Sequence, residues 1–219
     1  MPRTTYHHGD LPRALVAVAI DLARAGGTDD VTIREVARRL GVSPAAIYRH
    51  FPDRDALLGD VARAIRMQLA QRMLDEVEAI HEPDARARSV RRFIAVGRAY
   101  LDFAAEQPNL LAAAFIPIEP PDAHSEQPNP WEVLAGALDA LVAAGAMPPA
   151  RRLGAEVFAW STVHGFATLR ANRSFDVSGD PAPDPGALLD SIARALAIEP
   201  DPGNADGRDP IEDAVRPRR

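Results

Sequence analysis

The sequence predicts an all-α protein, and three observations support this prediction. Apolar residues recur every three or four positions along most of the chain, which is the period of a helix with one buried face. Stretches rich in proline and glycine, residues 117–130 and 174–186, interrupt this period and are typical of loops. No segment shows the convincing alternation that marks a strand. We therefore expect an N-terminal three-helix domain, joined by a long helix to a second all-helical domain.

The first expected helix runs from residue 11 to about residue 24. Asp10 can cap its beginning, and Gly26 and Gly27 can end it, because glycine accepts the backbone conformations found just past a helix. Its apolar residues follow one another at spacings of 4, 3 and 4: Leu11, Leu15, Val18 and Leu22. This spacing predicts one buried face.

Residues 32–51, TIREVARRLGVSPAAIYRHF, predict two short helices joined by a tight turn. Thr32 can cap the first helix, and Glu35 stands three residues later, where its side chain can reach back to the cap. Apolar residues then share one face of this helix: Ile33, Val36, Ala37 and Leu40. Gly41 can end the helix because it tolerates a positive φ.

The second short helix begins with Ser43 as its cap and Pro44 at its first position, where the missing N–H costs nothing. Across the two helices, a small residue, a glycine and an apolar residue that fills the angle between the helices occur in the order that a helix-turn-helix needs: Ala37, Gly41 and Ile47. The same spacing also fits an ordinary corner between two helices, because many such corners use glycine. Spacing alone therefore leaves two interpretations open, a DNA-binding motif and a structural corner.

Asp53 can cap a long helix that ends near Pro83. At 1.5 Å per residue this helix spans roughly 40 Å, which is enough to link two domains. Five further helices are expected, over residues 84–108, 109–115, 131–146, 149–172 and 187–197. Residues 199–219 are rich in proline, aspartate and glycine, which predicts a disordered tail.

The composition is that of a globular protein in a reducing compartment. The chain has 219 residues, 47% of them apolar, and no cysteine, which excludes disulfides, thiol nucleophiles and thiolate metal sites. No apolar run approaches the roughly 20 residues of a membrane span, and residues 1–10 lack the apolar core of a signal peptide. We therefore expect a cytoplasmic protein that does not enter a membrane.

The net charge of −6 at first argues against a nucleic-acid partner. Residues 1–55, however, hold eight Arg and seven Asp or Glu, whereas residues 56–219 hold 17 and 24. The acidic excess thus lies outside the helix-turn-helix region, which is compatible with a local basic patch. The chain has arginine and no lysine, and arginine suits bidentate contacts to phosphate or guanine. The arginines are spread along the whole chain, however, which favours codon bias in a GC-rich genome as the explanation.

Two overlapping segments resemble the TetR family of bacterial transcription regulators: VTIREVARRLGVSPAAIYRHF and the FPDRDALL that opens the long helix. Residues 11–60 carry this resemblance. The opening YHHGDL and the later WSTVHG, residues 160–165, are similar to the subgroup with a Trp-His-Gly type C-terminal domain. The resemblance implies a homodimer that binds a double-stranded DNA operator through a helix-turn-helix domain over residues 8–68.

The DNA contacts that the resemblance implies come from the second short helix, which would lie in a major groove, and from residues around it. They are Thr32, Arg34, Ser43, Pro44, Ala45, Ala46, Tyr48, Arg49, His50 and Arg54. Arginine can read guanine edges, and alanine or proline can pack on a thymine methyl. The family usually has lysine at Arg54, and arginine keeps the charge for a phosphate contact. Residues 3–6 either lie in the minor groove or along the DNA backbone, or form a frayed end.

The second domain, residues 84–198, would bind a small apolar or aromatic effector and form the dimer contact. The candidate pocket residues are Phe93, Tyr100, Phe103, Phe115, Trp131, Phe158, Trp160 and His164. His164 equally fits packing in the core or at the dimer contact. The resemblance implies that residues 149–172 and 187–197 pair with their copies in a four-helix bundle, with contributions from Arg152, Glu156, Val163 and Leu189.

No catalytic, cofactor or metal site is expected. The chain has no Walker A loop, no GxGxxG and no HExxH, and His7 and His8 lack a third ligand. We therefore predict a ligand-responsive repressor that binds a palindromic operator as a homodimer and is released by its effector. The alternative is an all-helical small-molecule-binding protein or enzyme whose helix-turn-helix is only a structural corner. The acidic remainder of the chain disfavours a DNA-packaging protein.

Overall fold

The computed structural model describes residues 11–118, 129–175 and 183–199. Within these ranges the chain forms helices and no strand, which confirms the all-α prediction. The predictions for residues 3–6, for His7 and His8, and for the tail from residue 200 onwards lie outside the described residues. None of the described helices is both long enough and apolar enough to cross a membrane.

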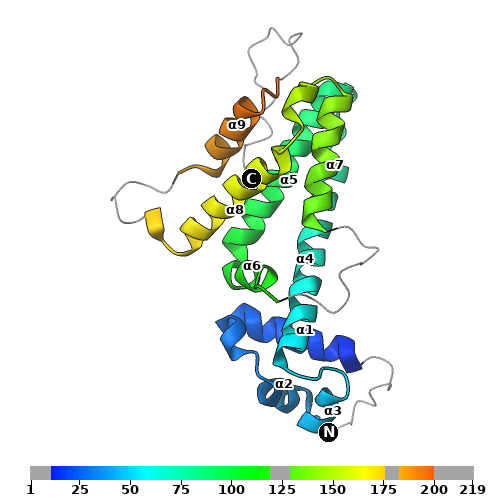
Figure 1. The fold of residues 1–219 in the computed structure, drawn as a ribbon, viewed down its shortest axis with the longest axis vertical. Coiled ribbons are helices and arrows are strands. Elements are labelled where there is room, and N and C mark those ends of the chain that lie inside the picture. The colour runs from blue at the N-terminus through cyan, green and yellow to red at the C-terminus, as the bar shows by residue number, and fades with distance from the viewer. Residues whose placement is uncertain (1–10, 119–128, 176–182, 200–219) are drawn as a thin grey trace. The chain divides into compact units, whose positions relative to one another are not determined.

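The helices form two compact units, and Figure 1 labels them. Of the described residues, the first unit contains 11–68 and 107–118, and the second contains 69–106 and those from 129 onwards. The first unit consists of α1 (Leu11–Gly26), the short turn η1 (Thr28–Asp30), α2 (Ile33–Leu40), α3 (Pro44–Tyr48), the beginning of α4 (Arg54–Glu78) and α6 (Pro108–Ala114).

The predicted ends of the two helix-turn-helix helices are confirmed. The Thr32 hydroxyl accepts the N–H of Glu35 at 3.2 Å, and the Ser43 hydroxyl accepts the N–H of Ala46 at 3.2 Å. Each of these bonds satisfies a backbone donor that the first turn of a helix leaves without a partner in the helix. Gly41 follows α2 with a φ of 71°, the left-handed conformation that glycine adopts without strain.

The reciprocal half of the predicted capping box is wrong. The N–H of Thr32 donates to the carbonyl of Asp30 at 3.1 Å. The Glu35 carboxylate instead accepts from the guanidinium of Arg38 at 2.6 and 2.8 Å and from that of Arg39 at 3.1 Å. Charge-assisted bonds of this kind are stronger than a bond to a neutral amide. The hydrogen bond from Arg38, followed by that from Arg39, lowers the pKa of the Glu35 carboxyl to about 2.

Helix α6 belongs to the first unit, whereas the domain ranges expected from the sequence place it in the second. It packs against α1, where Nδ2 of Asn109 donates to the carbonyl of Arg24 at 3.1 Å. At the end of α6, Nη1 of Arg66 on α4 donates to the carbonyl of Ala114 at 2.6 Å. Helix α6 therefore bridges α1 and α4 within this unit.

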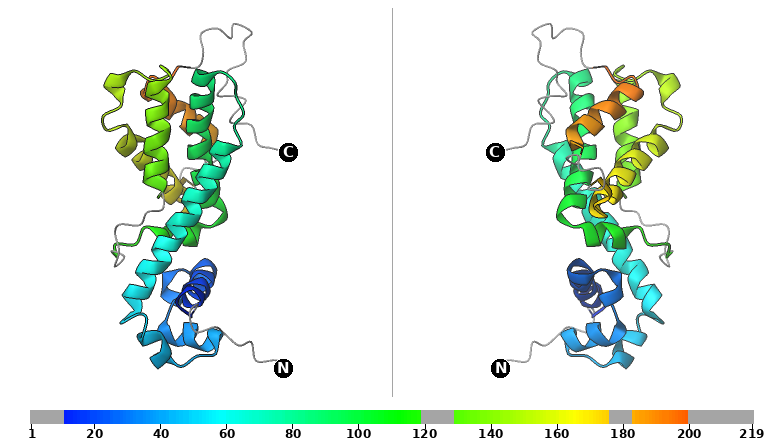
Figure 2. Two further views of the ribbon diagram at one scale, coloured as in Figure 1. Left: turned by 90° about the vertical axis from the view of Figure 1, so that its right-hand side faces the viewer. Right: turned by 90° about the vertical axis from the view of Figure 1, so that its left-hand side faces the viewer.

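The second unit is built around α5 (Ala85–Glu106). It packs against α7 (Pro130–Ala143), α8 (Ala155–Ala171) and α9 (Pro185–Ala195), and Figure 2 shows α5 and α7 running side by side. The buried large side chains of α5 are Val90, Phe93, Ile94, Val96, Tyr100, Leu101 and Phe103. A forked ion pair between Arg72 and Glu106, with N–O distances of 2.6 and 2.9 Å, joins the end of α4 to α5.

The single helix expected over residues 149–172 is wrong. The structure has the short turn η2 (Pro149–Arg151), and α8 begins only at Ala155. Gly154 lies between them with a φ of 78°, a left-handed conformation that cannot continue a right-handed helix. The sequence pattern does not reveal this break, because Leu153 stands four residues before Val157, as it would within a helix, although α8 begins after it.

Candidate DNA-binding surface and ligand pocket

Helix α3 buries one large side chain and exposes its neighbours. Ile47 is fully buried, and burying such a side chain stabilises the folded chain by about 1.5–3 kcal/mol. Tyr48 is 53% exposed, and Arg49 and His50 after it are also exposed. The predicted apolar plug thus anchors α3 and leaves three polar side chains in solvent.

The remaining residues expected at DNA lie in the same unit. Those that are exposed are Thr32, Arg34, Ser43, Pro44 and Ala45, and Ala46 is half-buried. Arg34 and Arg49 form no ion pair within the part of the chain that the structure describes, whereas Arg38 and Arg39 pair with Glu35. The positive charges of Arg34 and Arg49 are therefore not paired with a carboxylate of the described residues and are available to an external anion.

Arg54 has a contact that the sequence did not predict. Its Nε donates to the carbonyl of Val31 at 2.7 Å, and its Nη2 donates to the carbonyl of Thr28 at 2.6 Å. The guanidinium is half-buried between these groups. Arg54, the first residue of α4, therefore clamps the backbone that leads into α2. A phosphate contact from Arg54 stays a prediction.

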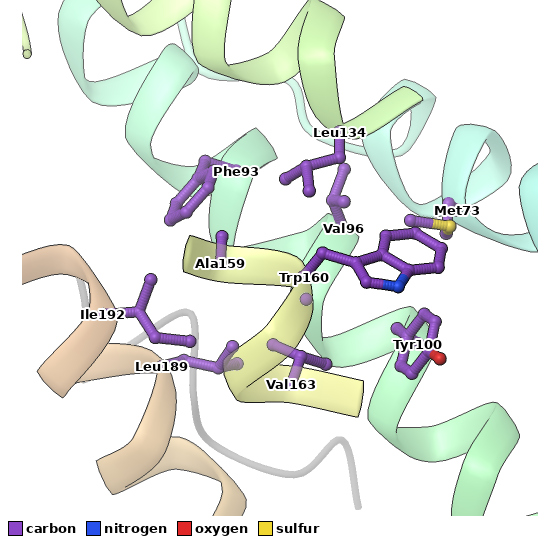
Figure 3. A pocket seen from close by; sticks show the side chains of 11 residues that line it. Met73, Phe93, Val96, Tyr100, Leu134, Ala159, Trp160, Val163, Leu189 and Ile192 are labelled. Carbon is purple, nitrogen blue, oxygen red and sulfur yellow. The ribbon is translucent and has the colours of Figure 1, made fainter. Parts of the chain in front are cut away.

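The second unit contains a pocket with about 390 Å³ of empty space, including its opening to solvent. The lining residues come from α4, α5, α7, α8 and α9 (Figure 3): Met73, Phe93, Val96, Gly97, Tyr100, Leu134, Ala159, Trp160, Val163, Leu189 and Ile192. Three of the side chains expected in a pocket, Phe93, Tyr100 and Trp160, are among them. An apolar cavity with few polar groups is the usual form of a small-molecule site.

The other expected pocket residues lie elsewhere. The ring of Trp131 lies 5.9 Å from that of Trp160 but is 42% exposed. Phe158 is also 42% exposed, and Phe103 is buried without lining the pocket. Phe115 follows α6 and belongs to the first unit. Phe103, Phe115 and Phe158 are thus not brought to the pocket, because aromatic character does not encode which face of a helix a residue occupies.

His164 supports the pocket from behind a lining residue. Its Nδ1 is hydrogen-bonded to the Tyr100 hydroxyl at 2.6 Å, and the two rings meet edge-on with centroids 6.3 Å apart. Burial raises the pKa of Tyr100 above its ordinary 10.0 and lowers the pKa of His164 below its ordinary 6.5. Both groups are therefore neutral near pH 7.

Two family models match the sequence over these two regions. The model described as bacterial regulatory proteins, tetR family, matches residues 15–61, which include α2 and α3. The model described as Tetracyclin repressor-like, C-terminal domain, matches residues 93–196, which carry most of the pocket. The chain belongs to the TetR family. Its resemblance to the Trp-His-Gly subgroup stays a prediction.

Individual proteins are similar to the chain to different extents. A solved protein of unknown function from Rhodococcus sp. RHA1 is 34% identical, with a TM-score of 0.67, over 89% of this chain and all of that one. The HTH-type transcriptional regulator BetI of Klebsiella pneumoniae (strain 342) is 34% identical over 76 residues, 39% of its length. The class A tetracycline repressor protein from transposon 1721 of Escherichia coli is 41% identical over 54 residues, 25% of its length. The matches to these two curated relatives cover 35% and 25% of this chain.

Two residues expected at the dimer contact of this TetR-family protein are instead buried within one chain. Val163 is 7% exposed and Leu189 is 3% exposed, and both line the pocket. Arg152 hydrogen-bonds the carboxylates of Asp139 and Glu156, so it ties α7 to the beginning of α8. Sequence spacing identified Val163 and Leu189 as apolar and helical, but it did not show which neighbour covers them.

Most lining residues of the pocket were missed by sequence reasoning, because an aliphatic side chain beside a cavity follows the same helical spacing as one in the core. Gly97 could have been recognised from the sequence, because a glycine within the apolar face of α5 indicates a close approach of another segment. A Cβ at this position would lie 2.5 Å from Cδ2 of Leu189. Gly97 therefore allows α9 to pack closely on α5 at the wall of the pocket.

Helix α8 also carries an exposed apolar face. Its large side chains are Val157, 58% exposed, Phe158, 42%, and Leu169, 46%, and the preceding Leu153 is 96% exposed. Phe158 and Leu169 lie on one face of α8, because 11 residues are close to three helical turns. Gly165, seven residues after Phe158, lies on the same face, and apart from its own helix and chain neighbours no described atom comes within 4 Å of the position a Cβ would take. Exposed apolar side chains grouped in this way are typical of an interaction site.

Proposed function

We propose that the chain is a ligand-responsive transcriptional repressor that binds a palindromic operator as a homodimer. The observation that carries the proposal is α3: Ile47 is fully buried, while the consecutive residues Tyr48, Arg49 and His50 are exposed. The tetR family model matches residues 15–61, which include this helix. The names of the curated relatives, a transcriptional regulator and a tetracycline repressor, support the proposal.

The DNA-binding domain would comprise residues 8–68, with α3 in the major groove. Tyr48 and Arg49 would contact base edges, because they leave the helix on its exposed side. Arg34 would meet a phosphate, because no carboxylate in the described part of the chain neutralises it. The other contacts are assigned to Thr32, Ser43, Pro44, Ala45, Ala46, His50 and Arg54, all half-buried or exposed.

The effector and dimer domain would comprise residues 84–198. A second copy of the chain would cover the exposed face of α8, since Val157, Phe158 and Leu169 are between 42% and 58% exposed and a two-fold contact pairs the same face on both copies. Such a dimer reads two half-sites about 34–36 Å apart. We assign no enzymatic activity to the chain and place it in the cytoplasm, where its operator lies.

The effector would act through a population shift. A ligand in the pocket favours the conformations with which it makes better contacts, and it can move the equilibrium only by that difference in affinity. If the favoured state spaces the two α3 helices wrongly for one turn of DNA, the operator is released. The pocket walls come from α4, whose beginning belongs to the DNA-binding domain, and from α5, α7, α8 and α9.

The test is a selection of random duplex DNA on the purified protein at about 0.15 M salt. We expect an enriched palindrome that the Tyr48→Ala/Arg49→Ala double variant no longer selects. Arg151→Ala, which removes an exposed arginine from η2, is the matched control and should select the same palindrome. A folded, dimeric protein that enriches no sequence would show that the helix-turn-helix is only a structural corner.

A further inference from the structure

The pocket of the second unit is uncharged, and its polar groups lie at one end. None of the 11 residues that line it carries a charge. Figure 3 shows the indole nitrogen of Trp160 and the hydroxyl oxygen of Tyr100 at one end, near Met73, whereas Leu189 and Ile192 lie at the other. A bound molecule therefore meets hydrogen-bonding groups at one end and aliphatic groups at the other.

The polar end is built from aromatic rings. The rings of Tyr100 and Trp160 meet edge-on, with centroids 5.3 Å apart and planes at 70°. The ring centroids of Trp131 and Trp160 lie 5.9 Å apart, with their planes at 56°. These contacts fix the indole as a wall, and aromatic rings attract further rings in offset or edge-to-face geometry. The pocket therefore favours a flat aromatic ligand over a flexible aliphatic one.

The electrostatics of the pocket disfavour an ionised ligand. The Tyr100 hydroxyl and the His164 imidazole share a hydrogen bond of 2.6 Å. Burial keeps both groups neutral, because it raises the pKa of Tyr100 and lowers that of His164. A carboxylate in this pocket would lose its hydration without meeting a cation among the lining side chains. An uncharged hydroxyl gives up less hydration and can hydrogen-bond at the polar end.

We propose that the pocket binds an uncharged aromatic molecule with one hydroxyl group. The hydroxyl hydrogen-bonds at the end formed by Tyr100 and Trp160, and the apolar part of the molecule points toward Leu189 and Ile192. The role of this molecule as an effector rests on the proposed function, but its binding to the pocket does not.

Three probes with the same skeleton separate the contributions: 4-ethylphenol, ethylbenzene and 4-ethylbenzoate. Isothermal titration calorimetry on the full chain at neutral pH measures their affinities, without DNA. We expect 4-ethylphenol to bind about two- to tenfold more tightly than ethylbenzene, because it adds one hydrogen bond. We expect 4-ethylbenzoate, which is ionised at this pH, to bind at least about tenfold more weakly than 4-ethylphenol.

Tyr100→Phe removes the hydroxyl and keeps the ring. It should reduce the affinity for 4-ethylphenol to near that for ethylbenzene and leave the affinity for ethylbenzene unchanged. Tyr48→Phe makes the same chemical change on α3, in the other unit, and should leave all three affinities unchanged. Circular dichroism of both variants checks that they fold, and the unchanged ethylbenzene affinity of Tyr100→Phe shows that its pocket is intact.

Tighter binding of 4-ethylbenzoate than of 4-ethylphenol would overturn the proposal, and so would binding of none of the probes. Equal loss of 4-ethylphenol affinity in both tyrosine variants would also contradict it. Operator selection in the absence of ligand is a separate measurement. A protein that selects an operator but ignores phenols refutes only this ligand class, and one that binds phenols but no operator refutes only the regulatory function.

Discussion

Replacing Arg54 tests whether this side chain holds the helix-turn-helix or contacts DNA. In the structure its guanidinium donates to the carbonyls of Val31 at 2.7 Å and Thr28 at 2.6 Å. Lysine, the usual family residue at this position, keeps the positive charge but lacks the rigid fork that reaches two acceptors at once. Arg54→Lys therefore separates the two roles, and Arg54→Met removes both.

The expected loss follows from the two hydrogen bonds. A bond to a charged group contributes about 1.5–3 kcal/mol, and the low end applies because the guanidinium is only half-buried. Arg54→Met should therefore lower the local stability of the first unit by about 3 kcal/mol, and Arg54→Lys by about 1.5 kcal/mol if one bond survives. At 1.4 kcal/mol for each factor of ten, the lysine variant should open about tenfold more often.

Hydrogen exchange with mass spectrometry measures this effect directly. Peptides covering residues 28–51 should exchange faster in both variants, while peptides from α5 serve as the internal reference. Arg63→Met is the matched control on the same helix, since within the described residues Arg63 forms an ion pair only with its near neighbour Asp60, at 3.1 Å. It should leave exchange in residues 28–51 unchanged.

Operator affinity at several salt concentrations gives the second readout. A phosphate contact predicts that Arg54→Lys binds like the wild type and that Arg54→Met lowers the salt slope by about 0.9 for each lost contact. A clamp predicts that both variants bind more weakly with the slope preserved. Wild-type exchange and wild-type affinity in Arg54→Lys would refute the clamp.

Two further predictions concern the second unit. Gly97→Ala places a Cβ 2.5 Å from Leu189, so Leu189 must move and calorimetry should show weaker binding of 4-ethylphenol. Gly136→Ala on α7 is the control, because its new Cβ meets nothing within 4 Å outside its own helix. It should raise the free energy of unfolding by about 0.5–1 kcal/mol and leave the affinity for 4-ethylphenol unchanged. Equal affinities of the two variants for 4-ethylphenol would contradict the packing argument. Val157→Glu should raise the dimer dissociation constant by at least about 30-fold, the size of a hot-spot effect of about 2 kcal/mol, in analytical ultracentrifugation. Ala140→Glu on the exposed side of α7 is its control, and a Val157→Glu variant that remains as dimeric as this control would exclude the α8 face.

Local chemistry made the helix-turn-helix predictable. Thr32, Ser43 and Gly41 act on backbone groups within a few residues of themselves, so their roles depend little on the rest of the fold. Ile47 was predictable as the plug because its spacing from Gly41 places it toward the helix that precedes it. The ion pairs of Glu35 with Arg38 and Arg39 were not predicted. The N–H of Thr32 and these two guanidinium groups can all donate to the Glu35 carboxylate, and the sequence does not show which of them does.

The pocket was predictable only in part. Phe93, Tyr100 and Trp160 were identified by residue type, and three other aromatic residues of the same type lie away from the cavity. Aliphatic lining residues such as Leu134 and Ile192 carry no signal, because a cavity is an absence of atoms that depends on several helices at once. The hydrogen bond between Tyr100 and His164 joins residues 64 positions apart, which no spacing rule connects.

The all-α class, the caps and plug of the helix-turn-helix, and the family could all be predicted from the amino-acid sequence. These features depend on helical period and on contacts within one or two turns, which are written into consecutive residues. Three features became visible only in the folded chain: Arg54 clamps the carbonyls of Val31 and Thr28, α6 belongs to the first unit, and Val163 and Leu189 line a pocket. Each of these depends on which distant segment packs against a given face, and helical period shows that a face is buried without showing what buries it.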